Sequence, residues 1–159
     1  MTEPNPYGLT PENLARLQEL TVASLEAAVL QDEQAVWAAV SQLVDPTGPY
    51  GPREALAWVV TMLRVHLGDV QGHPGIAMPL AIAVEPDGTQ HNVPVDEAPP
   101  GVRTYVRIGA AWANDDPEAV ADLWTALVLS RDVEQILLCM RTALMDAAAT
   151  VREGRAGLN

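Results

Sequence analysis

The chain has 159 residues, of which 48% are hydrophobic and 19% charged, and its net charge is −12 at pH 7. A chain of this length is expected to bury a substantial core in one domain, and its apolar content excludes an intrinsically disordered protein. The acidic balance opposes binding to nucleic acids and to anionic membranes, so neither is expected as a partner. The charged fraction lies below the typical value of about 25%, which favours a surface partly covered by another protein.

The single cysteine, Cys139, lies in an apolar run and cannot form an intramolecular disulfide, which fits a reducing compartment. A free cysteine among apolar neighbours is typical of a buried structural thiol. Residues 1–8 lack the basic and apolar segments of a signal peptide, and the chain has no run of about 18 apolar residues. We therefore expect a cytoplasmic protein. The absence of lysine and the abundance of alanine favour a bacterial, GC-rich genome.

The first half of the chain predicts three helices after a flexible tail at residues 1–9. Thr10 supplies a hydroxyl N-cap and Pro11 fits the first helical position. Asp32 is expected to cap the second helix, and Gly68 to end the third. The predicted helices cover residues 10–30, 32–44 and 52–67.

The centre of the chain, residues 69–98, is interrupted by glycine and proline and predicts no long helix. Residues 80–84 resemble a short strand and residues 89–95 a returning strand, joined by a Glu-Pro-Asp-Gly turn. Pro94 suits an edge position, because proline cannot donate to a strand ladder. The sequence thus predicts a short β-hairpin insert around residues 79–95, with an irregular loop as the alternative.

The second half completes a single helical domain predicted at residues 10–153, with a flexible C-terminus at residues 154–159. The fourth helix carries the apolar positions of residues 102–112. Asp116 and the proline after it are typical of the start of a fifth helix. A sixth begins near residue 131, either separately or as a continuation of the fifth. Apolar residues surround its middle, so we expect it to be the most buried helix.

Two stretches resemble each other, residues 27–44 and 110–128. Each reads as a helix end, a polar turn with an acidic cap and the start of a second helix, with Pro117 as one extra residue in the second copy. Amphipathic helices with aspartate caps also resemble each other by chance, so duplication and coincidence both stay open. The predicted fold class is therefore mainly α: a single-domain bundle of five or six helices in two similar halves, residues 10–68 and 99–153, with the hairpin between them.

One group of titratable residues has the spacing of metal ligands: His66, Asp69 and His73. Histidine and carboxylate bind zinc or iron, and three such ligands leave an open catalytic position. A histidine at a helix C-terminus is equally expected without a metal, because a cation is favoured there. The acidic pairs at residues 32–33 and 115–116 are best explained as helix caps. The chain has no nucleophile elbow and no phosphate-binding glycine loop, so no catalytic residue and no cofactor is predicted.

Two kinds of residue predict contact with a partner. Trp37 and Trp58 lie beside the main apolar stripes of their helices, and tryptophan is enriched at interfaces. The acids of the central insert are balanced by no basic residue, and such a segment would dock a basic surface; plain solubility is the alternative. The acids concerned are Glu85, Asp87, Asp96 and Glu97.

The leading interpretation is a non-enzymatic protein–protein interaction or assembly module, whose partner is another protein or a second copy of the chain in a homodimer. One alternative is an acidic inhibitor that mimics nucleic acid and blocks a basic partner protein, which requires a continuous negative face. The other is a small metal-dependent enzyme that uses His66, Asp69 and His73.

Overall fold

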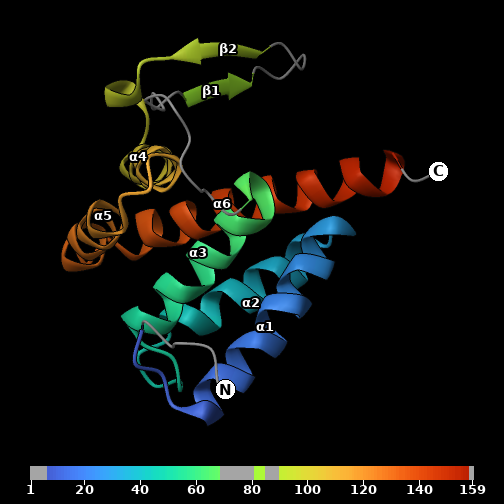
Figure 1. Ribbon diagram of the computed structural model, residues 1–159, viewed down its shortest axis with the longest axis vertical. Coiled ribbons are helices and arrows are strands. Elements are labelled where there is room, and N and C mark those ends of the chain that lie inside the picture. The colour runs from blue at the N-terminus through green and yellow to red at the C-terminus, as the bar shows by residue number, and fades with distance from the viewer. Residues whose placement is uncertain (1–6, 69–80, 85–89, 158–159) are drawn as a thin grey trace. The chain divides into compact units, whose positions relative to one another are not determined.

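The computed structural model describes residues 7–68, 81–84 and 90–157, and in these it confirms the predicted mainly helical fold, with six α-helices (Figure 1). The helices are α1 (Pro11–Val29), α2 (Glu33–Val44), α3 (Pro52–Leu67), α4 (Pro100–Ala113), α5 (Pro117–Leu129) and α6 (Val133–Gly157). Across this part of the chain, none of the helices has both the length and the apolar character that crossing a membrane requires.

Two short strands lie between α3 and α4 in the sequence. β1 (Ala81–Val84) pairs with β2 (Gln90–Val93) in an antiparallel ladder, and one short 3₁₀ helix, η1 (Val95–Glu97), follows. Residues 85–89, which would form the turn, lie outside the described residues. The hairpin insert around residues 79–95 therefore stays a prediction.

The chain divides into two compact units. Unit 1 contains residues 1–68 together with residues 143–159, and unit 2 contains residues 69–142. The single helix α6 thus contributes its C-terminal part to unit 1 and its N-terminal part to unit 2. The predicted halves, residues 10–68 and 99–153, stay a prediction.

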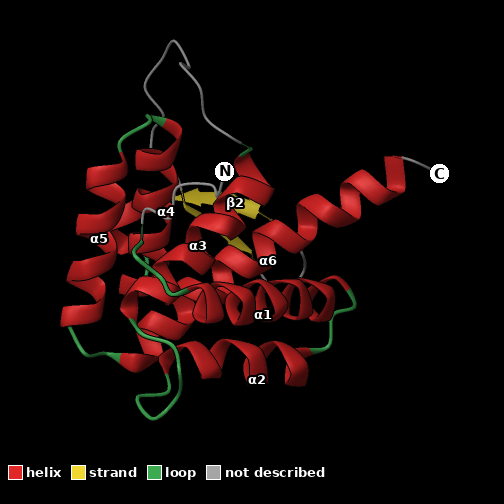
Figure 2. Ribbon diagram, turned by 60° about the horizontal axis from the view of Figure 1, so that its bottom comes forward, coloured by secondary structure: helices red, strands yellow, loops and turns green. Residues whose placement is uncertain are grey.

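In unit 1, α1 and α2 lie side by side and α3 contacts both of them (Figures 1 and 2). The helix α1 buries one face only, made by Leu17, Leu20, Ser24 and Ala28. In contrast, α3 is buried around most of its circumference, through Ala55, Ala57, Trp58, Val59, Val60, Met62 and Leu63. A larger share of α3 than of the described part of α6 is buried, so the expectation that the sixth helix is the most buried is wrong.

The structure describes residues on both sides of the predicted bounds of the helical domain, 10 and 153. Leu9, expected in a flexible tail, is buried, and Tyr7 is partly buried. Burial raises the pKa of the Tyr7 hydroxyl, an effect that the charge of Arg64 partly opposes. At the other end, α6 continues to Gly157, past the expected end at residue 153.

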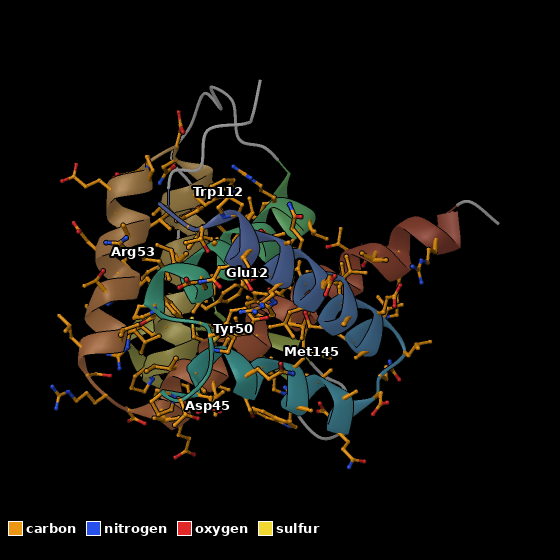
Figure 3. All side chains as sticks on the ribbon, turned by 90° about the horizontal axis from the view of Figure 1, so that it is seen from below. Glu12, Asp45, Tyr50, Arg53, Trp112 and Met145 are labelled. Atoms are coloured by element: carbon orange, nitrogen blue, oxygen red, sulfur yellow. The ribbon has the colours of Figure 1, made fainter. Side chains whose placement is uncertain are left out.

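Polar contacts hold the loop between α2 and α3, where Figure 3 labels Asp45 and Tyr50. The Asp45 carboxylate accepts hydrogen bonds from the Thr47 hydroxyl at 2.7 Å and from the Thr47 N–H at 2.9 Å. These bonds hold the pKa of Asp45 below its usual value, because they stabilise the carboxylate. The Tyr50 hydroxyl donates to the carbonyl oxygen of Arg16 at 3.4 Å and so ties the loop to α1.

The three turns that join helices directly share one unusual backbone conformation. In α1–α2, α4–α5 and α5–α6, one residue has a positive φ: Gln31 at 58°, Asp115 at 54° and Arg131 at 58°. These are the non-glycine residues with positive φ in the described part of the chain. An L-residue pays about 1 kcal/mol or more for this left-handed conformation, which glycine adopts freely.

An aspartate follows each of these residues and caps the next helix. Its carboxylate accepts a hydrogen bond from the backbone N–H three residues further on, which satisfies one of the N–H groups that a helix start leaves unpaired. The bonds are Asp32 with Ala35 at 3.1 Å, Asp116 with Ala119 at 3.1 Å and Asp132 with Gln135 at 3.3 Å.

The α1–α2 and α4–α5 turns agree in their hydrogen bonds as well. In both, the positive-φ residue donates its N–H to the carbonyl three residues back, and the aspartate donates its own to the carbonyl five residues back. This pairs Gln31 with Asp115 and Glu33 with Pro117 without an insertion. The expected extra residue at Pro117 is therefore wrong, since Pro117 corresponds to the first helical residue after each cap.

In unit 2, α4 approaches α6 closely at Gly101. The N-cap of α4 is Pro99, which has no side-chain acceptor, and the N–H of Gly101 donates instead to Gln135 Oε1 at 2.8 Å. A Cβ at position 101 would overlap the carbonyl oxygen of Gln135 and lie 3.1 Å from the Cys139 nitrogen. Only glycine fits at this crossing without a shift of backbone.

A pair of glycine substitutions in α4 tests this crossing. We expect Gly101→Ala to lower the free energy of unfolding by about 1–3 kcal/mol, because the methyl group meets backbone atoms. Gly109→Ala in the same helix meets nothing within 4 Å, and we expect it to raise stability by about 0.5–1 kcal/mol. Urea denaturation followed by circular dichroism measures both. Equal effects of the two substitutions would contradict the close approach.

A second pair of substitutions tests the left-handed turns. Gln31→Gly removes the steric cost of positive φ, and we expect it to raise the free energy of unfolding by about 0.5–1 kcal/mol. Ala38→Gly, at an exposed position inside α2, should lower it by about 1 kcal/mol. Opposite signs in the same urea titrations are the expected result. A loss of stability with Gln31→Gly would argue against the turn conformation.

Candidate interaction surface

Trp58 lies in the interior of unit 1. Its Nε1 donates a hydrogen bond to Ser24 Oγ at 3.2 Å, and Ser24 Oγ donates in turn to the carbonyl oxygen of Thr21 at 3.0 Å. Ser24 is a polar residue buried to 1% exposure, and Trp58 is fully buried. An indole N–H in a core needs an acceptor, and Ser24 provides it. The structure therefore does not place Trp58 on a surface open to a partner.

Trp37 lies at the surface of α2. Its side chain is 39% exposed, while the adjacent Val36 is buried. Two further large apolar side chains of the same helix pair are exposed on α1, Val22 at 58% and Leu30 at 78%. We call the exposed side chains of Val22, Leu30 and Trp37 the α1–α2 face.

Sequence reasoning found Trp37 but missed Val22 and Leu30. Leu30 is the C-cap of α1, immediately before the left-handed residue of the turn. Leu30 lies away from the core because α1 ends just before it. The apolar periodicity of the sequence does not show where the helix ends. A comparable pair, Leu129 at 73% and Val133 at 52%, flanks the α5–α6 turn in unit 2.

Of the four acids predicted to dock a basic surface, Glu85 and Asp87 lie outside the described residues. Asp96 and Glu97 are exposed in η1. Asp96 accepts a hydrogen bond from Arg107 of α4 at 2.7 Å. A pair this exposed contributes about 0–1 kcal/mol to stability, but it places a positive charge next to one of the insert's acids.

His66 connects the end of α3 to α6 within unit 1. Its Nδ1 lies 2.9 Å from Thr150 Oγ1, and its Nε2 lies 3.8 Å from Asp146 Oδ2. The Thr150 hydroxyl also donates to the carbonyl oxygen of Asp146 at 3.1 Å. Nδ1 of His66 is therefore engaged by a neighbouring side chain of α6.

The other two residues of the predicted metal group, Asp69 and His73, lie outside the described residues. In the part that the structure describes, no three His, Cys, Asp or Glu side chains are grouped so that they could hold a metal ion.

The predicted cap residues divide into two roles. Asp32 and Asp116 cap α2 and α5, as expected. Asp115, which the sequence grouped with them, is instead the left-handed residue of its turn. Asp tolerates this conformation better than most residues. These acids are thus explained by the helix starts and turns that they form.

Cys139 is fully buried in α6, as expected for a structural thiol. Burial raises the pKa of the thiol to about 12, because the thiolate would lose its hydration. A reactive cysteine needs a lowered pKa and access to solvent. Cys139 has neither.

Neither a family model, nor a curated protein, nor a solved structure matches this chain. The α1–α2 face, which includes the exposed Trp37, is the candidate site that the chain's own geometry offers.

Thiol labelling tests the burial of Cys139. With a pKa of about 12, the thiolate fraction at pH 8 is about one in ten thousand. We expect Ellman's reagent to leave the native protein unlabelled at this pH and to label one thiol per chain in concentrated urea. Rapid labelling of native protein, with circular dichroism unchanged, would contradict the buried position.

Proposed function

We propose that this chain is a non-enzymatic protein–protein interaction or assembly module that binds its partner through the α1–α2 face. The observation that carries the proposal is the exposure of three large apolar side chains on one helix pair, with Trp37 among them. Single exposed apolar residues are normal. Tryptophan, however, dominates the binding energy of many interfaces, and Trp58 shows that this unit already fills its core with another tryptophan.

The finer parts of the prediction belong to the same proposal. We infer a cytoplasmic location from the single buried cysteine. The hairpin insert around residues 79–95, supported by the pairing of β1 with β2, would form a second contact region together with the exposed Glu97 that follows it.

We advance neither alternative function, because no specific observation favours it. The acids Asp32, Asp116 and Asp132 form helix starts, and Asp96 pairs with an arginine, whereas a nucleic-acid mimic uses its acids as a free negative face. For the metal-dependent enzyme, His66 already uses Nδ1 in a hydrogen bond with Thr150.

Site-specific crosslinking tests the proposal directly. The photoreactive p-benzoylphenylalanine replaces Trp37 in one variant, and Thr125, an exposed residue of α5, in a matched control. In cells of the native host we expect a discrete crosslinked species at position 37 that is absent at position 125, because the α1–α2 face meets a partner and the exposed side of α5 does not. The same products at both positions, or none at position 37, would count against the module.

Sedimentation equilibrium of the purified chain then separates the two kinds of partner. A dimer that Trp37→Ala dissociates, and that Leu129→Ala leaves intact, identifies a second copy as the crosslinked protein. A monomer at all concentrations assigns the crosslink to a different protein.

A further inference from the structure

We propose that the α1–α2 face binds a basic, amphipathic helical segment of another protein. The inference rests on the proposed function and names the chemistry of the partner. Three observations carry it. Residues 17–52 contain no basic residue. The acids of α1 recur at a regular spacing, and the arginines Arg16 and Arg152 contact other groups of α1.

The stretch that forms the face contains no basic residue. Residues 17–52 hold five acids and no arginine, lysine or histidine. All three apolar side chains of the face fall in this stretch. An apolar surface surrounded by one sign of charge selects a partner of the opposite sign and accelerates its association.

The acids of α1 lie along the same side of the helix as the exposed valine. Glu12, Glu19 and Glu26 recur every seven residues, which is close to two helical turns, and all are exposed. Val22 lies three residues after Glu19 and four before Glu26, so the three side chains are neighbours on the helix surface. A helix laid along α1 with basic residues at the same seven-residue spacing would pair with Glu19 and Glu26 and contact Val22 between them.

Two arginines that contact α1, Arg16 and Arg152, bind groups other than Glu19 and Glu26. Arg16 pairs with Glu12 at 2.7 Å, one turn apart at the N-terminal end of the helix. Arg152 of α6 donates to the carbonyl oxygen of Ala28 at 3.0 Å. Ala28 is fully buried, so that contact lies on the inward side of α1, away from Val22.

A second copy of the chain fits this surface poorly. It would bring the same acids against Glu19 and Glu26, and the chain as a whole carries a charge of −12. Like charges placed opposite one another oppose association. The partner is therefore a different protein that supplies arginine or lysine together with an apolar side chain for Trp37.

The test uses a fluorescent synthetic peptide about 18 residues long, with leucine on one helical face and lysine on the other. A matched peptide carries glutamate in place of lysine. Fluorescence anisotropy with the full chain should show binding of the lysine peptide that weakens as salt rises, and no binding of the glutamate peptide.

Matched variants of the chain locate the binding site. We expect the double variant Glu19→Gln, Glu26→Gln to weaken lysine-peptide binding about 10-fold, since two opposite-charge contacts are lost. The control Glu118→Gln, Asp122→Asn removes the same charge from exposed positions of α5, and we expect a change of less than about twofold. Trp37→Ala should weaken binding about 10-fold or more, against little effect of Leu129→Ala.

Three outcomes would overturn the inference. Equal weakening by the two acid pairs means that the peptide responds only to total charge. Absence of binding by the lysine peptide, or equal binding of the glutamate peptide, excludes a basic partner. Crosslinking at position 37 to a second copy alone assigns the face to self-association. A crosslink to a different protein, combined with failure of the lysine peptide, would keep the proposed function and reject only the basic chemistry.

Discussion

The helix pairs depend on one local device, an aspartate cap placed directly after a residue in the left-handed conformation. The left-handed residue reverses the chain within one position, and the carboxylate then satisfies the start of the next helix. Gln31, Asp115 and Arg131 are not glycine, so each turn carries a steric cost of about 1 kcal/mol. A cap contributes stabilisation of a similar size, typically about 1 kcal/mol. The steric cost and the stabilisation by the cap nearly cancel, and the contribution of the turn is to hold the two neighbouring helices together.

Two other helix ends are completed by side chains of α6. In unit 2, the N-terminus of α4 follows a proline, and Gln135 accepts the N–H of Gly101. In unit 1, the last turn of α1 has no basic residue, and Arg152 donates to the Ala28 carbonyl. A cation at a helix C-terminus is favourable both as a hydrogen-bond donor and through the helix dipole. Each unit therefore uses its part of α6 to satisfy backbone groups as well as to bury apolar area.

Local signals predicted the helices well, because caps and prolines act within one turn of the residue that carries them. Asp32, Asp116 and Pro117 identified two helix starts without any tertiary information. The difference between Trp37 and Trp58 could not be predicted in this way. Both lie beside an apolar stripe, and the indole N–H of the buried Trp58 is satisfied by a hydroxyl on another helix, Ser24, far away in sequence. Periodicity within one helix carries no information about an acceptor on its neighbour.

The resemblance between residues 27–44 and 110–128 also has a local cause. The α5–α6 turn lies outside the matched stretches, yet Arg131 has the same φ and Asp132 makes the same cap. The shared pattern is therefore explained by a turn type that the chain uses three times, without requiring duplication. What the turn does not explain is the difference between the copies: the first helix pair exposes Trp37, and residues 17–52 around it hold no basic residue. A few apolar side chains among charges of one sign resemble a transient interface more than an obligate one, whose core is larger and more apolar. The feature particular to this molecule is thus the surface of α1 and α2, and its composition favours a partner that binds and leaves.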